Sequence, residues 1–382
     1  MPKDNNILIC PLDWGIGHAT RCVPIIKILS DKGCNVVIAA DNRPLAFLKQ
    51  EFPGLTFIRF PGYRIRYQKK CSLFFTMLWQ IPRIVIGIIR EHQKLREIVR
   101  DYQVQAVISD NRFGLWHKNI FSIYLTHQII IKSASGNYFL ELILYRIHKY
   151  FIRHYDECWI PDAEGENNLS GDLSHRFKLS RNSYFIGPLS RFTLSDQDKE
   201  MEISTGQDLD IDIMVIISGP EPQRSFFEEM ITEQIQKSNL KSVIVKGITE
   251  VNTNETHNER LEIYSHLPTD KMKTLIERSG MIICRPGYSS IMDLAALGKR
   301  AIFIPTPGQT EQIYLAKYHK SKNCFFYMNQ KDFDLKYALQ KSKSYQGILM
   351  DFQQETLLNR IKKLTENLYG FDYTESESNY EK

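Results

Sequence analysis

Residues 281–305, MIICRPGYSSIMDLAALGKRAIFIP, hold a complete strand–turn–helix–strand unit. The apolar run MIIC predicts a strand that ends in a Pro-Gly turn. Ser289 or Ser290 would cap the short helix that follows, and Gly298 would close it. A second apolar run over 300–305 predicts the next strand. Strands that are apolar throughout, with no alternating polar positions, are typical of a parallel sheet that helices cover on both faces.

The same alternation of short apolar runs and longer helical segments continues in both directions along the chain. In the N-terminal half we expect strands at 7–12, 35–40, 55–60, 105–109, 121–125 and 156–160, and helices at 18–32, 43–52, 72–99 and 137–154. In the C-terminal half we expect strands at 211–217, 241–246, 260–264, 281–284, 300–305 and 323–327, and helices at 223–238, 270–279, 288–297 and 309–321. The sequence therefore predicts an α/β protein with two Rossmann-like doubly wound sheets in series.

A polar, acidic stretch between about residues 190 and 210 separates the two halves. We expect an N-terminal domain over 1–193, a linker over 194–210 and a C-terminal domain over 211–370. An amphipathic helix over 352–369 ends the fold and could pack back on the first domain, and the tail 371–382 is expected to be disordered. Doubly wound sheets bind ligands at the carboxyl ends of their strands, so functional residues are expected there.

The composition of the 382 residues is that of a protein with buried cores: 43% hydrophobic, 12% aromatic and 24% charged. The formal net charge of +5 is too small to predict a nucleic-acid binder, although it suits anionic ligands or an anionic membrane surface. The seven cysteines are scattered without a C-x-x-C pair, which predicts reduced thiols rather than a disulfide framework or a zinc site. Because no signal peptide and no membrane span is evident, a cytoplasmic protein is expected.

The first expected strand is followed by GIGHATR (15–21), which opens a helix. Its two glycines would let the backbone approach an anionic ligand at the helix N-terminus. A nicotinamide site is one interpretation, because Asp41 ends the next strand where a ribose-binding acid would sit, but Thr20 replaces the third glycine. His18 could be a hydrogen-bonded structural histidine or a general base that works near neutral pH.

Two other strand ends carry polar side chains that could reach the same cleft. Asp110 could orient His18 or touch a ligand, and the alternative is that it only caps the next helix. His127 follows the fifth strand, where it could line the cleft or be merely a polar loop residue.

The C-terminal half presents three polar loops after its strands. Ser218 and Gly219 would offer a hydroxyl and free backbone N–H groups at a helix start, which a phosphate needs, although a plain turn is the alternative. Asp293 lies in the first turns of a helix, where it could accept hydrogen bonds from sugar hydroxyls or only complement the helix dipole. The loop 305–312, PTPGQTEQ, presents further polar groups to the same crevice.

The motifs at 284–299 and 305–312, in this order and spacing, resemble the nucleotide-sugar end of GT-B glycosyltransferases of the family 28 type. That family includes the N-acetylglucosaminyl transferase that makes lipid II for peptidoglycan. The resemblance is carried mainly by the C-terminal half and extends over most of 7–325, with the Gly-x-Gly-His turn at its front. It implies a GT-B fold, in which the two Rossmann-like domains face an interdomain cleft.

The resemblance also implies roles for particular residues. His18 would be the catalytic base or oxyanion partner, with Asp110 beside it, while Gly15, Gly17 and His127 would lie on the acceptor side. The implied donor-binding residues are Arg191, Ser218, Gly219 and Pro220 for the diphosphate, His266 and Leu267 for the uracil, Asp293 for the ribose, Glu311 and Gln312 for the sugar, and also Arg285 and Gly287.

We therefore expect an inverting glycosyltransferase that moves a hexose or N-acetylhexosamine from a UDP-sugar to an unidentified acceptor, which could be lipid-linked. Two alternatives remain on the same fold: a UDP-sugar 2-epimerase or hydrolase, and a nucleotide-sugar-binding protein without catalysis. The run DLDID (208–212) imitates the D-x-D motif of metal-dependent transferases, but it lies in the expected linker. No metal and no cofactor is therefore expected.

Residues 62–96 combine basic ends with a strongly apolar, aromatic middle. One interpretation is an interfacial patch that docks on anionic lipid and meets a lipid-linked acceptor. The alternative is a buried helix pair that covers the sheet. The segment 145–154, YRIHKYFIRH, adds basic character to the same domain. The expected location is the cytoplasm, with the inner face of the cytoplasmic membrane as a candidate surface.

Overall fold

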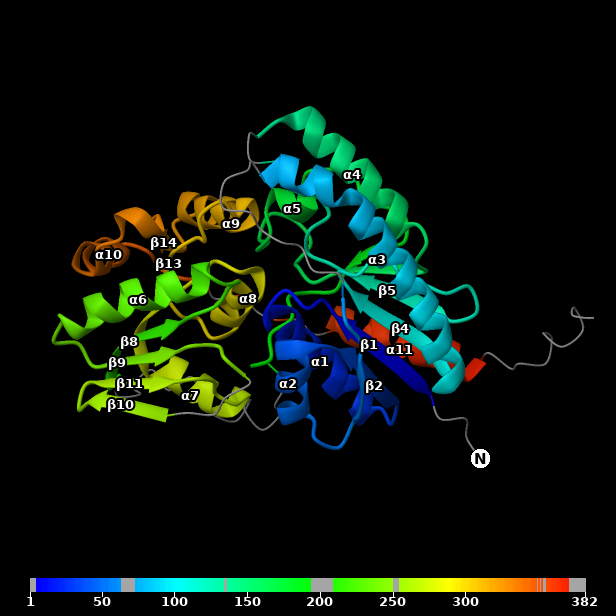
Figure 1. Cartoon of the computed structure of the whole chain (residues 1–382), viewed down its shortest axis with the longest axis horizontal. Coiled ribbons are helices and arrows are strands. Elements are labelled where there is room, and N and C mark those ends of the chain that lie inside the picture. The colour runs from blue at the N-terminus through cyan, green and yellow to red at the C-terminus, as the bar shows by residue number, and fades with distance from the viewer. Residues whose placement is uncertain are drawn as a thin grey trace, which may run out of the picture.

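The computed structural model describes residues 5–62, 73–133, 136–193, 209–249, 254–348, 350, 352 and 355–370. Two seven-stranded sheets, each with helices on its faces, form the N-terminal and C-terminal parts of the molecule (Figure 1). The predicted α/β class with two doubly wound sheets is confirmed. The expected tail 371–382 and most of the expected linker (194–208) lie outside the described residues, and the exact domain limits stay predictions.

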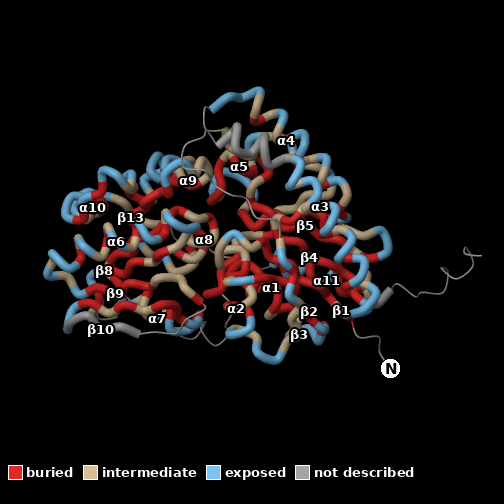
Figure 2. Tube along the Cα trace, viewed as in Figure 1, coloured by how far each residue is buried: buried red, intermediate tan, exposed pale blue. Residues whose placement is uncertain are grey.

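The N-terminal sheet is parallel throughout, with the strand order β3-β2-β1-β4-β5-β6-β7. Its strands are β1 (Asn6–Pro11), β2 (Asn35–Ala40), β3 (Thr56–Arg59), β4 (Val104–Asp110), β5 (Phe121–Leu125), β6 (Glu157–Ile160) and β7 (Ser183–Phe185). Its helices are α1 (Gly17–Asp31), α2 (Asn42–Glu51), α3 (Leu73–Asp101), α4 (Tyr138–Ile152) and α5 (Asp172–His175). Nearly all residues of the central strands are buried, as Figure 2 shows, which explains their mostly apolar sequences.

The C-terminal sheet has the order β10-β11-β9-β8-β12-β13-β14, and only its edge strand β10 runs antiparallel to its neighbour. Its strands are β8 (Ile211–Ile216), β9 (Ser242–Val245), β10 (Asn254–Asn258), β11 (Leu261–Tyr264), β12 (Ser279–Cys284), β13 (Ala301–Phe303) and β14 (Phe326–Tyr327). Its helices are α6 (Gln223–Gln236), α7 (Thr269–Arg278), α8 (Tyr288–Ala296), α9 (Thr310–Ser321) and α10 (Leu335–Ser342), with a short 3-10 turn η2 (Gln330–Asp332).

Five of the described elements were not predicted from the sequence, which are β7, α5, β10, η2 and α10. The strand β10 reads NETHN and has no apolar residue, so hydrophobic periodicity cannot reveal it. The strand β7 has only three residues. The helix α10 carries a recognisable start signal, because the Asp334 side chain accepts a hydrogen bond from the backbone N–H of Tyr337 at 2.7 Å.

The last helix, α11 (Glu355–Gly370), returns to the N-terminal domain, where Figure 1 draws it beside β4. Its apolar residues Leu357, Ile361 and Leu364 are buried in a hydrophobic cluster that also contains side chains of α1. On its polar side, Arg360 Nη1 lies 3.2 Å from Glu157 Oε1 of β6. The chain therefore connects the two domains twice, once between β7 and β8 and once between α10 and α11.

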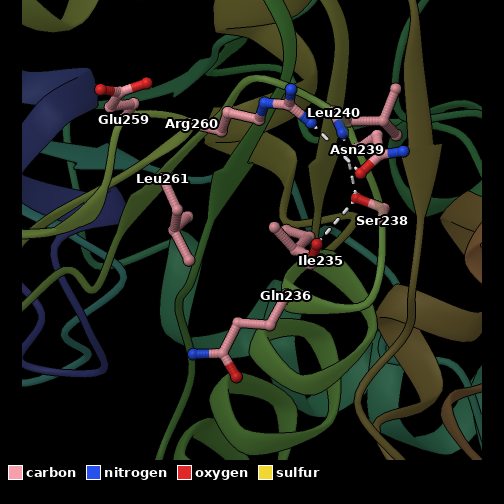
Figure 3. A pocket seen from close by; sticks show the side chains of 8 residues that line it. All are labelled: Ile235, Gln236, Ser238, Asn239, Leu240, Glu259, Arg260 and Leu261. Carbon is pink, nitrogen blue, oxygen red and sulfur yellow. Dashed lines mark hydrogen bonds between the residues drawn. The ribbon is translucent and has the colours of Figure 1, made fainter.

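A surface hollow of about 410 Å³ lies on the C-terminal domain (Figure 3). It is lined by the end of α6 and by residues that directly precede or begin β9 and β11, which are Ile235, Gln236, Ser238, Asn239, Leu240, Glu259, Arg260 and Leu261. These are amino ends of parallel strands, so the hollow lies at the opposite edge of the sheet from the carboxyl ends.

Candidate active site

The two sheets bring the carboxyl ends of their central strands to the contact between the domains. The helices α1 and α8, which follow β1 and β12, touch each other there. Ser289 Oγ of α8 donates a hydrogen bond to the carbonyl oxygen of Gly17 at 2.7 Å. Tyr288 Oη donates to the carbonyl oxygen of Pro161 at 2.9 Å. The predicted residues from both halves of the sequence therefore face one interdomain region.

The loop after β1 needs glycine at positions 15 and 17 for two different structural reasons. Gly15 has φ of +103°, a backbone conformation that side-chain-bearing residues rarely adopt. Gly17 begins α1, and a Cβ atom placed there would lie 3.2 Å from Ser289 Oγ of the other domain. The first glycine permits the turn, and the second permits the close approach of the two domains.

His18 and Asp110 form a hydrogen-bonded pair, as the first of the two readings of Asp110 predicts. His18 Nδ1 lies 3.1 Å from Asp110 Oδ2. The Asp110 carboxyl is fully buried at the end of β4, and burial alone would raise its pKa. The Arg21 guanidinium and His18 outweigh that effect and lower the pKa of Asp110 to about 2. His18 Nδ1 also lies 2.9 Å from Arg21 Nη2. The tautomer that carries its proton on Nδ1 donates to the ionised Asp110 carboxylate and leaves His18 Nε2 as the acceptor.

Arg21 is the central residue of this cluster, and the sequence reasoning did not select it. Its Nε donates to Asp110 Oδ2 at 2.8 Å, its Nη2 bonds Oδ1 of the same carboxylate, and its Nη1 lies 2.8 Å from His127 Nδ1. Arg21 is 2% exposed. The available signal was its spacing: residues three apart on a helix share one face, so Arg21 follows His18 into the same region.

His127 contacts the other domain through its second ring nitrogen. His127 Nε2 lies 2.9 Å from Glu311 Oε1, where Glu311 stands in the first turn of α9. The His127 ring stacks on Tyr288 with the ring centroids 4.2 Å apart. Burial lowers the pKa of His127 and Arg21 lowers it further, against the opposing effect of Glu311. The residues His18, Asp110, Arg21, His127 and Glu311 thus form a continuous cross-cleft chain.

The predicted ribose-binding residue Asp293 lies in α8 and is held by the segment that follows β7. Ser190 Oγ donates to Asp293 Oδ1 at 2.7 Å, and Arg191 Nε lies 3.6 Å from Asp293 Oδ2. Burial raises the pKa of Asp293, and Arg191 and Ser190 counteract part of that rise. The carboxylate therefore stands between a hydroxyl and a guanidinium at the boundary of the two domains.

Arg191 has capacity for a further ligand. Its side chain is 6% exposed, and its Nε and Nη1 make no hydrogen bond within the part of the chain that the structure describes. The guanidinium lies over Phe47 and Phe192, with its central carbon 5.7 Å and 4.9 Å from the two ring centroids. A buried guanidinium with unused N–H donors suits a diphosphate.

His266 lies next to the same arginine. Its ring meets Phe47 edge-on with the centroids 5.8 Å apart, and its buried Nε2 makes no hydrogen bond to any described residue. Burial, followed by the charge of Arg191, lowers the pKa of His266 to about 4, so the ring is neutral at pH 7. Leu267 is buried beside it.

The loop after β8 carries Ser218, Gly219 and Pro220 as predicted. Gly219 has φ of +112°, and a Cβ atom there would lie 3.8 Å from Thr306 Oγ1. Thr306 Oγ1 is buried without a hydrogen-bond partner among the described residues, while the Thr306 backbone N–H donates to Gln312 Oε1 at 2.8 Å. Gln312 therefore fixes the loop after β13 with its side-chain oxygen, and the Gly219 backbone approaches that loop closely.

Arg285 is placed differently from the other predicted donor residues. Its guanidinium is fully buried and donates to the carbonyl oxygens of Ile304 and Gln223, at 2.8 Å and 3.1 Å, and to Gln330 Oε1 at 2.7 Å. Burial lowers its pKa to about 10. This geometry favours a structural role that ties three loops together. Gly287, the next predicted residue, is the N-cap of α8.

Two protein-family models match the chain. The glycosyltransferase family 28 C-terminal domain matches residues 216–368, and glycosyl transferase family 1 matches residues 6–128. A UDP-N-acetylglucosamine–N-acetylmuramyl-(pentapeptide) pyrophosphoryl-undecaprenol N-acetylglucosamine transferase from Sulfurihydrogenibium sp. is 24% identical over 162 residues, which cover 41% of this chain and 46% of that protein. The protein of the same name from Francisella tularensis strain WY96-3418 is 24% identical over 402 residues, which cover 96% of this chain and 99% of that protein.

Among solved structures, the calicheamicin glycosyltransferase CalG4 superposes with a TM-score of 0.60 at 12% identity, covering 96% of this chain and 99% of that one. Such a likeness supports the fold, with two facing Rossmann-like domains. Together with the family models and the curated relatives, it shows that this chain has the GT-B fold and is similar to glycosyltransferases of the family 28 type over residues 216–368.

Proposed function

We propose that the protein is an inverting, metal-independent glycosyltransferase that moves a hexose or N-acetylhexosamine from a UDP-sugar to an acceptor hydroxyl. The observation that carries the proposal is the orientation of His18 by Asp110 at the contact between the domains, where the Asp293–Arg191 pair also lies. The first pair supplies a base, and the second supplies a carboxylate for ribose hydroxyls and a cation for a diphosphate.

The base would work through His18 Nε2, which has no hydrogen-bond partner among the described residues. Asp110 accepts the Nδ1 proton, so the ring keeps the tautomer that can receive a proton at Nε2 and the carboxylate stabilises the imidazolium that results. As the acceptor oxygen loses its proton it attacks the anomeric carbon from the face opposite the leaving UDP. Such attack inverts the anomeric configuration.

The departing UDP would be stabilised by Arg191 and by the backbone N–H groups of Ser218 and Gly219. The alternative of a metal held by the DLDID run (208–212) gains no support from Asp210, because that carboxylate accepts a hydrogen bond from Arg278 Nε at 2.9 Å. The proposed reaction therefore uses protein cations for the charge that a metal would otherwise carry.

Incubation with UDP-N-acetylglucosamine and a membrane lipid extract tests the function. Release of UDP that requires the extract supports a transferase. Turnover of the nucleotide sugar that is independent of the extract would show an epimerase or hydrolase, and binding without turnover under either condition would refute both enzymes. Repeating the assay with EDTA tests the proposed independence from metal, because chelation should leave the rate unchanged.

The ribose role of Asp293 has its own test. Replacing Asp293 by alanine should raise the KM for the UDP-sugar about tenfold with kcat little changed, because a hydrogen bond to a charged group contributes about 1.5–3 kcal/mol. Asp293→Asn keeps one acceptor oxygen, so its KM for the UDP-sugar should lie between those of the wild type and the alanine variant. A variant whose donor KM equals that of the wild type would show that the carboxylate only holds Ser190 and Arg191 in place.

The acceptor could be lipid-linked, and the helices α3 and α4 offer a face for a membrane. Residues 63–72 of the predicted patch lie outside the described residues. Trp116 packs between His92 of α3 and His154 just after α4, with ring centroids 4.6 Å and 4.8 Å away, so the two helices are neighbours. Their exposed apolar side chains are Val85, Ile86, Ile89, Tyr138, Phe139, Ile143, Ile147 and Tyr150, which together are called the outer apolar face.

The charges around the outer apolar face favour an anionic surface. Exposed arginines flank it, at positions 83, 90, 146 and 153. Within residues 83–90 and 138–153 the one acidic residue is Glu141. It is buried, and its Oε2 is 2.7 Å from Arg176 Nη1. No helix of the described residues is both long and apolar enough to cross a membrane. We therefore propose that the outer apolar face lies on, rather than in, an anionic bilayer.

Vesicle binding tests this surface. Ile143→Glu with Ile147→Glu should reduce co-sedimentation with vesicles that contain anionic lipid at least about tenfold, because two apolar anchors are lost and each added negative charge is repelled by about 1 kcal/mol. The matched control replaces Phe226 and Tyr337 by glutamate, two exposed aromatics of the C-terminal domain with the same change in charge. Equal losses in both double variants would refute the surface.

A further inference from the structure

We infer that His127 is a positioning residue that holds Glu311 for the donor sugar, so that the acceptor-binding domain helps to recognise the donor. This inference rests on the proposed function and on the donor-sugar contact that the family resemblance implies for Glu311. It replaces the sequence-based expectation of an acceptor-side role for His127.

The hydrogen bonds of His127 determine its tautomer. Arg21 is protonated at any pH the protein will meet, so Arg21 Nη1 must donate to His127 Nδ1 across their 2.8 Å contact. The ring is neutral because burial lowers its pKa, and its single proton is therefore on Nε2. This proton is donated to Glu311 Oε1 at 2.9 Å. Both ring nitrogens are occupied, so His127 can act on a ligand only through another residue.

Several contacts hold the His127 ring in this orientation. The ring is 5% exposed and lies parallel to the Tyr288 ring, with an interplanar angle of 3°. The Tyr288 hydroxyl is itself anchored on the carbonyl oxygen of Pro161. Behind the ring, the His127 carbonyl oxygen accepts from Ser174 Oγ at 2.6 Å. The ring is therefore held by Tyr288 on one face and by Arg21 and Glu311 at its two nitrogens, so its orientation is fixed.

Glu311 has one oxygen engaged and one available. His127 binds Oε1, whereas Oε2 makes no hydrogen bond within the described residues, and the side chain is 21% exposed. Burial would raise the pKa of Glu311, but His127, His18 and Arg21 hold it below its ordinary value, so the carboxylate is ionised at neutral pH. An ionised carboxylate with one oxygen fixed can present the other to a sugar hydroxyl in a single orientation.

The consequence is a link between the two halves of the reaction. The cross-cleft chain reaches the base His18 through Asp110 and Arg21 at one end and the donor sugar through Glu311 at the other. Glu311 is correctly placed only when the domains are close enough for the contact with His127. Sugar recognition and approach of the base to the anomeric carbon would therefore occur together.

The test separates the sugar from the nucleotide by titration calorimetry. The affinities of UDP and of UDP-N-acetylglucosamine are measured for the wild type, His127→Leu, His127→Gln, Glu311→Ala and the double variant His127→Leu/Glu311→Ala. We expect His127→Leu to weaken UDP-N-acetylglucosamine relative to UDP about tenfold, which corresponds to about 1.4 kcal/mol. Glu311→Ala should have the same effect, and the double variant should lose no more than either single variant.

His127→Gln is the conservative control, because one amide can accept from Arg21 and donate to Glu311, so this variant should keep most of the discrimination. UDP binding that stays at the wild-type level shows that the leucine variant is folded. Additive losses, or an unchanged ratio in His127→Leu, would overturn the positioning role alone. A wild-type protein that binds UDP-N-acetylglucosamine no better than UDP would overturn the sugar contact of Glu311, and one that binds neither would overturn the proposed function as well.

Discussion

Replacing His18 by alanine should lower kcat at least about 100-fold while the affinity for UDP stays near that of the wild type, because positioned acid–base catalysis is worth about 10²–10⁴-fold. His18 sits in the first turn of α1 on the side of the N-terminal domain, and its contacts are Asp110 and Arg21 rather than any residue of the C-terminal sheet. Steady-state rates of UDP release, together with calorimetric titration of UDP, measure both quantities.

The matched variant is His18→Gln, which has a similar size and can still bond Asp110 but cannot accept a proton. It should be as slow as the alanine variant. If the glutamine variant instead retained most of the wild-type rate, His18 would be an oxyanion partner or an acceptor ligand and not the base. A parallel loss of UDP affinity in both variants would place His18 at the donor.

Replacing Arg21 by leucine should destabilise the fold by about 3–5 kcal/mol, since it leaves the buried Asp110 carboxylate without its cation. Arg21 is also the only described residue that bonds both Asp110 and His127 in the cross-cleft chain. Thermal unfolding should show a clear loss of Tm. The double variant Arg21→Leu/Asp110→Asn removes the uncompensated charge and should be more stable than the single variant.

The loss of folding stability in Arg21→Leu should depend on pH with a defined sign. In the wild type the pKa of Asp110 is about 2, below its unfolded value of about 3.9, so its stabilising contribution is complete above about pH 4 and is lost as the pH falls through about 2. Without Arg21, burial dominates and raises the pKa of Asp110. The folded variant then binds the extra proton, so its deficit in stability should shrink as the pH is lowered from 7 toward 5. A deficit that is constant over this range would contradict the assigned charge state.

The fold could be predicted from the sequence because its central strands are largely buried on both faces and are mostly apolar. The strand β12 and its neighbour β13 are such runs, and the helix between them begins and ends at recognisable turn residues. The edge strand β10 could not be found, because a strand at the edge of a sheet needs no apolar side chains and is formed by main-chain pairing with β11.

The site was predictable only in part, for a different physical reason. Position at a strand end pointed to Asp110, and position at a helix start pointed to His18, so their pairing followed from the fold. Arg21 and His127 are 106 residues apart in the sequence, and His127 and Glu311 are 184 residues apart. Both contacts depend on how distant segments and the two domains pack. Local pattern carries no information on such distances. The same limit explains Arg285. In the sequence it follows a strand end, where ligand-binding residues are expected, but its guanidinium is buried and donates to the backbone carbonyl oxygen of Ile304.

The return of α11 to the first domain constrains how such proteins can be recombined. Because the chain passes between the domains twice, the C-terminal domain is an insertion between β7 and α11 rather than an appended module. A C-terminal domain exchanged between relatives at a single junction would carry a foreign α11, in which Leu357, Ile361 and Arg360, the partner of Glu157, are replaced. A chimaera with two junctions, one before β8 and one after α10, would keep the native helix and its partners. The C-terminal domain can therefore be exchanged with α11 kept on its native partners only through a two-crossover exchange.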